Sequence, residues 1–141
     1  MMMNFLTKYR DFGLLILRAG VGIDFLLIHG WRKITAEPER LQQIGAFMPS
    51  FGIEEIQIFW GLCAALTETV GAILFAAGLF YRPVCALLGF TMLVAVYAHL
   101  STGDSWGATS HALQLVFVFF GLMFTEPGKY SLDNWIKNRR K

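Results

Sequence analysis

The apolar segment from residue 12 to residue 30 constrains this chain more than any other feature, because it contains the polar residues Arg18, Asp24 and His29. The segment has the length of a membrane-spanning helix. Inside a bilayer, each such polar side chain costs about 2.5–3.5 kcal/mol at mid-depth unless a partner stabilises it. A helix that keeps all three must therefore direct them toward other helices or toward a bound ligand.

Three further apolar segments follow, at residues 57–80, 83–100 and 106–125. Each is close to the roughly 20 residues that a transmembrane helix requires. The chain is 55% hydrophobic and 16% charged, whereas soluble domains are about 25% charged. We therefore predict an all-α fold, an integral membrane four-helix bundle in which residues 1–141 form one domain. The lipid bilayer is the expected partner, and no nucleic acid is expected.

Basic residues are distributed unevenly over the two sides of the predicted bundle. If the N-terminus is cytoplasmic, the opposite side holds only Arg32, Lys33 and Arg40. The cytoplasmic side then holds Lys8, Arg10, Arg82, Lys129, Lys137, Arg139, Arg140 and Lys141. Because cytoplasmic segments carry the excess of Lys and Arg, both termini are predicted to be cytoplasmic.

The loop between the first two spans is too long for a simple turn. Leu41, Ile44 and Phe47 recur in it at helical spacing. This pattern predicts a short amphipathic helix that lies on the membrane surface or covers the end of the bundle.

Three histidines from three different spans fall in one layer of the predicted bundle. At about 1.5 Å per residue, His29, His99 and His111 lie roughly 21–26 Å from the inner boundary, and Gln114 lies one turn below His111. These residues are candidates to contact a ligand. Because they lack a metal-ligand spacing such as HxxxH, a quinone or another small polar ligand is favoured over a metal or haem. The simpler interpretation, favoured on the sequence alone, places each histidine at the water interface, where it donates to a loop carbonyl.

Glu68 lies close to mid-bilayer, on a helix face of small residues by which membrane helices approach one another. It is therefore expected to face the bundle interior, where it could relay a proton or anchor a ligand pocket. The structural alternative is an ion pair with Arg18, although the estimated depths of Arg18 and Glu68 in the bilayer differ by about 9 Å. Helical periodicity places Arg18 and His29 on one face and directs Asp24 away from both.

The polar residues belong to motifs that extend along the chain. The first span contains Arg18-x-Gly20-x-Gly22, His29-Gly30 and Lys33. The later motifs are Glu68-x-x-Gly71-Ala72, Gly78-Leu79, Arg82, His99 and the closing Pro127-Gly128-Lys129-Tyr130-Ser131-Leu132-Asp133. With these motifs the chain resembles the DoxX family of small four-helix membrane proteins over nearly its whole length.

The resemblance implies a four-helix bundle in the bacterial inner membrane. Members of that family include a membrane subunit of a thiosulfate:quinone oxidoreductase and a membrane partner of redox enzymes in oxidative-stress complexes. No agreed catalytic residues are carried over from the family. The residues that match its polar positions are Arg18, His29, Glu68 and His99, whereas Asp24 stands where the family usually has an apolar residue.

The leading hypothesis is a bacterial inner-membrane subunit of a redox system, quinone-linked or active in oxidative stress, that binds a small ligand within its bundle. At most, the chain is a quinone-linked oxidoreductase subunit that acts with a redox partner protein. His29 and His99 would contact the ligand head group, Glu68 would hold or exchange a proton, and Arg18 would orient Glu68. The alternatives are a non-catalytic scaffold or assembly factor for a partner protein and, third, a small-solute transporter. A homo-oligomer is compatible with each of them.

Overall fold

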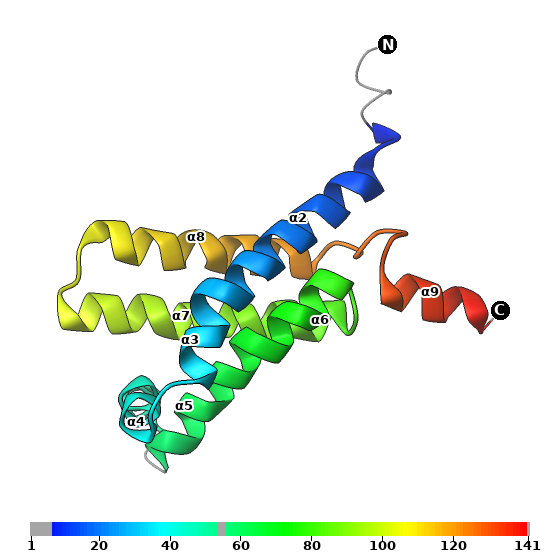
Figure 1. The fold of residues 1–141 in the computed structure, drawn as a ribbon. Coiled ribbons are helices and arrows are strands. Elements are labelled where there is room, and N and C mark those ends of the chain that lie inside the picture. The colour runs from blue at the N-terminus through cyan, green and yellow to red at the C-terminus, as the bar shows by residue number, and fades with distance from the viewer. Residues whose placement is uncertain (1–6, 54–55, 141) are drawn as a thin grey trace.

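The computed structural model describes residues 7–53 and 56–140, whose arrangement Figure 1 shows. Four helices are long and apolar enough to cross a membrane: Arg10–Ile34, Gln57–Ala77, Tyr81–Thr102 and Trp106–Met123. The described part of the chain contains no strand. Large apolar side chains are exposed on all four helices, as lipid-facing surfaces require; examples are Ile16, Val70, Leu87 and Phe117. For the described residues, the prediction of an all-α fold with four helices able to span a membrane is confirmed.

The first two spans are continuous helices, and each contains a π-helical segment. The first span consists of α2 (Arg10–Asp24), η1 (Phe25–Gly30) and α3 (Trp31–Ile34). The second consists of α5 (Gln57–Leu66), η3 (Thr67–Gly71) and α6 (Ala72–Ala77). The two π-helical segments contact one another. Such wide turns are rare in helices overall, and many of those that are known lie at functional sites.

The third and fourth spans form a second pair of helices, α7 (Tyr81–Thr102) and α8 (Trp106–Met123). In Figure 1 this pair crosses the pair formed by the first two spans. Glycines in the left-handed region end two of the helices: Gly78 follows α6 and Gly103 follows α7. The second span therefore ends before the predicted residue 80, since the backbone turns at Gly78.

Aromatic rings at the centre of the bundle join all four spans. Phe25 of η1 and Phe75 of α6 both contact Phe119 of α8 edge-to-face, with ring centroids 5.4 and 5.3 Å apart. Phe75 also stacks on Tyr81 of α7 at 5.8 Å. These four residues are 0–1% exposed. Each such aromatic pair contributes about 0.5–1.5 kcal/mol beyond the area that it buries.

The loop between the first two spans contains α4 (Pro38–Gly45) and a 3-10 turn, η2 (Met48–Phe51). Figure 1 shows α4 beside α5 at one end of the molecule. Two glycines allow this close contact. A Cβ atom at Gly45 would overlap the carbonyl of Gln57, and one at Gly61 would overlap the carbonyl of Leu41. The α4 backbone is therefore in direct contact with the α5 backbone, which fixes α4 over this end of the bundle.

The C-terminal segment ends in α9 (Leu132–Arg139) and is held against the opposite end of the bundle. The Asp133 carboxylate accepts hydrogen bonds from the backbone N–H groups of Phe80 and Tyr81, at 3.0 and 2.9 Å. These are otherwise unpaired donors at the start of α7. The Asp133 backbone N–H in turn donates to the Gly78 carbonyl at 3.0 Å. The segment thus caps α7 and stabilises the turn before it.

Candidate functional site

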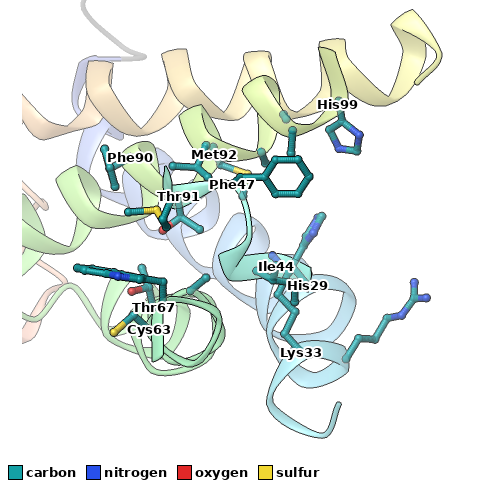
Figure 2. Close-up of a pocket in the computed structure, with 18 of the residues that line it drawn as sticks. His29, Lys33, Ile44, Phe47, Cys63, Thr67, Phe90, Thr91, Met92 and His99 are labelled. Atoms are coloured by element: carbon teal, nitrogen blue, oxygen red, sulfur yellow. The ribbon is translucent and has the colours of Figure 1, made fainter. Parts of the chain in front are cut away.

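A cavity of about 640 Å³ lies between the first span, α4, α5, α7 and the start of α8. Figure 2 shows side chains from several of these segments around it. Most of its wall is apolar, and part of that wall comes from the loop between the first two spans. The loop contributes Ile44, Phe47 and Met48. The volume lies in the range of pockets that enclose small molecules, about 300–1,000 Å³.

The three histidines of the predicted layer all line this cavity. The rings of His29 and His111 are nearly parallel, with centroids 5.8 Å apart. His99 lines the cavity from α7, and Figure 2 shows it with His29 around the same space. The depth estimate thus placed these residues at one level, and the fold brings them to one cavity.

His29 and His99 differ in their polar contacts. The His29 ring lies 4.9 Å from the Phe25 ring, and its Nε2 atom is buried without a hydrogen-bond partner among the described residues. A polar ligand atom would satisfy this nitrogen. The Nδ1 atom of His99 lies 2.7 Å from the carboxylate of Asp104, in the turn after α7. Hydrogen bonding with His99 lowers the pKa of the Asp104 carboxyl below its usual value.

Glu68 does not pair with Arg18, contrary to the predicted ion pair. Its Oε1 atom lies 2.5 Å from Nζ of Lys33, and the Glu68 side chain is fully buried while that of Lys33 is 25% exposed. The Oε2 atom of Glu68 is buried without a hydrogen-bond partner in the described part of the chain. Lys33 also lines the cavity, so Glu68 is linked to the cavity through Lys33.

The close approach of η1 and η3 explains why Lys33 takes this position. A Cβ atom at Gly30 would lie 2.6 Å from the Glu68 carbonyl oxygen, so the two backbones are nearly in contact there. The helix continues past Gly30 to Ile34, beyond the predicted end at residue 30, and this brings Lys33 to Glu68. The wide turn of η1 also changes the direction of the later side chains relative to α2. The assumption of one uniform period from Arg18 to His29 therefore fails.

Arg18 lies in a separate buried site at the other end of the first span. Its guanidinium donates to the backbone carbonyls of Tyr130 and Ala76, at 2.8 and 3.3 Å. The side chain is 0% exposed, although only part of its hydrogen-bonding capacity is used. Arg18 does not line the cavity. Its contacts join the first span, the second span and the C-terminal segment.

Two other polar residues of the predicted spans also lie outside the cavity lining. Gln114, a candidate ligand contact, is exposed on α8. Asp24 is exposed on α2. No group of three or more His, Cys, Asp and Glu residues in the described ranges could hold a metal ion.

Sequence reasoning missed three basic residues of the cavity lining, namely Arg32, Lys33 and Arg40. Arg32 and Arg40 were assigned only to the orientation of the bundle, and Lys33 was given no role in a site. The one available signal was Lys33, which belongs to the same motif as His29 and Gly30. Arg40 could not be assigned to the cavity because the sequence left open whether its helix lies on the membrane surface or covers the end of the bundle.

Among known protein families, a family model described as DoxX matches residues 13–100 of this chain. The match covers most of the first and third spans, all of the second span, the loop that carries α4, and both partners of the Lys33–Glu68 ion pair. No curated protein and no solved structure matches the chain.

Proposed function

This chain belongs to the DoxX family, and on that premise we propose that it is a membrane subunit of a redox system that binds a small ligand in its cavity. The system is quinone-linked or active in oxidative stress, and a partner redox protein supplies the electrons. We place it in the bacterial inner membrane, as family membership suggests. The excess of basic residues on the predicted cytoplasmic side supports an orientation with both termini in the cytoplasm.

The observation that carries this proposal is the convergence of His29, His99 and His111 on one largely apolar cavity. A quinone has a polar head with two carbonyl oxygens and an apolar tail. A histidine N–H can donate to such an oxygen, and the apolar wall suits the tail. The buried Nε2 atom of His29 supports this assignment, because it has no other hydrogen-bond partner in the described residues.

The polar residues then have distinct roles. His29 and His99 contact the head group, and Glu68 holds or exchanges a proton. Lys33, rather than Arg18, orients Glu68, because its ammonium group forms the ion pair with that carboxylate. Arg18 is left with a packing role at the other end of the span.

The test is to purify the chain in a mild detergent and to measure co-purified quinone by mass spectrometry. We expect bound quinone in the unmodified chain and a loss of at least about tenfold in His29→Ala or His99→Ala, the effect of about 1.4 kcal/mol. Gln114→Ala is the matched control, because Gln114 is a polar residue of α8 whose side chain does not line the cavity. An absence of quinone from every sample, or equal retention by all variants, would overturn the proposal. A visible spectrum of the same samples tests for haem.

A non-catalytic scaffold is the second candidate, because Arg18 and Glu68 both have bonds that join helices. In that case Glu68→Gln lowers stability or expression, and any redox phenotype follows the amount of protein alone. Quinone retention and redox phenotype, both normalised to protein amount, separate the two functions.

A further inference from the structure

We propose that the mouth of the cavity binds an anionic phospholipid, with the phosphate at Arg32 and Arg40 and an acyl chain along the apolar wall of the loop. This site goes beyond the proposed function, because it takes a bilayer lipid rather than the ligand of the redox system. The proposal stands on the charge of the cavity lining and on the segments that form it.

All the permanently charged side chains that line the cavity are basic: Arg32, Lys33 and Arg40. Glu37 and Glu39 are near Arg40 in the sequence but are not part of the lining. A ligand near this surface therefore meets positive charge from α3 and from α4. Charge of one sign around a concave site attracts the opposite charge.

Lys33 differs from the two arginines, because its charge is balanced by Glu68 within the bundle. The described residues have one further contact of this kind, between His99 and Asp104, which is an ion pair only when His99 is protonated. Neither pair includes an arginine. Within residues 7–53 and 56–140, the only polar contact of either guanidinium group is from Arg40 Nη1 to the neutral Gln43 side chain, at 3.4 Å. Arg32 and Arg40 therefore provide positive charge that the described residues do not neutralise.

Both arginines are exposed, so a head group can reach them from outside the bundle. The same cavity continues along Ile44, Phe47 and Met48, which offer apolar surface to an acyl chain. A free anion would contact only the arginines. A phospholipid would contact the arginines with its phosphate and the apolar surface with its acyl chain. Guanidinium groups also bind phosphate through paired hydrogen bonds. This combination of charge and apolar surface favours a lipid over a soluble anion.

Trp60 lines the cavity and provides a fluorescent probe for the acyl chain. The test uses the full chain in mixed micelles with Trp31→Phe, Trp106→Phe and Trp135→Phe, so that Trp60 is its single tryptophan. These three indole rings are exposed. Lipids brominated on the acyl chain quench Trp60 where they contact it. Brominated phosphatidylglycerol is compared with brominated phosphatidylcholine, which has the same phosphate and tail but no net charge.

We expect phosphatidylglycerol to reach half-maximal quenching at a lower mole fraction than phosphatidylcholine, by about fivefold for each arginine that contacts it. Arg32→Gln/Arg40→Gln should remove this preference. Lys137→Gln/Arg140→Gln should keep it, because these basic residues lie in or beside α9 and do not line the cavity. Circular dichroism and thermal unfolding show whether each variant is folded.

Three results would overturn the proposal. The first is equal quenching by the two lipids in the unmodified chain, and the second is a preference that persists in Arg32→Gln/Arg40→Gln. The third is loss of the preference when millimolar inorganic phosphate is added, which would assign the site to a soluble anion. Quinone retention is measured on the same samples, so that failure of the lipid site is distinguished from failure of the proposed function.

Discussion

Replacement of Gly78 by alanine tests how strongly Arg18 holds the bundle together. Gly78 has φ of +67°, and a Cβ atom there would overlap Arg18 Nη1 and lie 2.6 Å from Ser131 Cβ. Gly103 has nearly the same backbone conformation, φ +71°, but no atom within 4 Å of the added Cβ. The pair therefore separates the cost of the backbone conformation from the cost of displacing Arg18 and Ser131, and the Arg18→Met background isolates the part that is due to Arg18.

The expected loss in the free energy of unfolding is larger for Gly78→Ala than for Gly103→Ala, because the Arg18 side chain beside Gly78 is fully buried. An alanine in the left-handed region costs about 1–2 kcal/mol, and Gly103→Ala should show only this loss. Gly78→Ala should also disturb the hydrogen bonds from Arg18 to Tyr130 and Ala76. Hydrogen bonds from a charged donor contribute about 1.5–3 kcal/mol each, so we expect an excess loss of about 3 kcal/mol.

The assay is unfolding in mixed micelles, where the fraction of sodium dodecyl sulfate is raised and helix content is followed by circular dichroism. Arg18→Met provides a second background, in which most of the excess loss from Gly78→Ala should disappear because the guanidinium is gone. Equal losses in Gly78→Ala and Gly103→Ala would refute this account. The account is also refuted if the excess loss of Gly78→Ala over Gly103→Ala is unchanged in the Arg18→Met background.

Three further predictions concern the cavity and its surroundings. Lys33→Met should lower the free energy of unfolding by about 3 kcal/mol, because it leaves the buried Glu68 carboxylate without its cation. Glu68→Gln should cost less, because Lys33 is 25% exposed and can turn toward the cavity; the same unfolding assay measures both. Gly30→Ala should cost about 2 kcal/mol, because the added Cβ meets backbone that cannot rotate away. The Asp104 carboxyl should titrate below its ordinary pKa of about 3.9 in carbon-13 NMR spectra, and His99→Ala should raise that pKa.

Controls and contrary outcomes are available for each of these predictions. Gly20→Ala is the control for Gly30→Ala, since nothing lies within 4 Å of its Cβ and alanine favours a helix; equal effects at both positions would contradict the close contact. For the ion pair, the contrary result is a larger loss in Glu68→Gln than in Lys33→Met.

For Asp104, the contrary result is a titration that does not change in His99→Ala. The sign of the pH effect also follows. Because the folded pKa is lowered, this contact stabilises the loop above about pH 4 and is lost as the pH falls through the folded pKa.

The sequence determined the spans and the level of the histidines. Four apolar segments of about 20 residues favour helices that cross the bilayer, because a helix satisfies its backbone hydrogen bonds within one segment. The constant rise of a helix then fixes how deep each residue lies. For this reason His29, His99 and His111 could be placed in one layer before any contact was known, and the cavity lies where they meet.

Only the tertiary structure decided which side chains pair and which segment closes the cavity. Lys33 rather than Arg18 reaches Glu68 because two π-helical turns meet at Gly30, and helical periodicity cannot foresee a wide turn. Arg18 instead bonds a carbonyl 112 residues away in the sequence. Likewise, α4 forms part of the cavity wall because its backbone packs on α5. Depth depends on position within one helix, whereas these contacts depend on how separate helices approach one another.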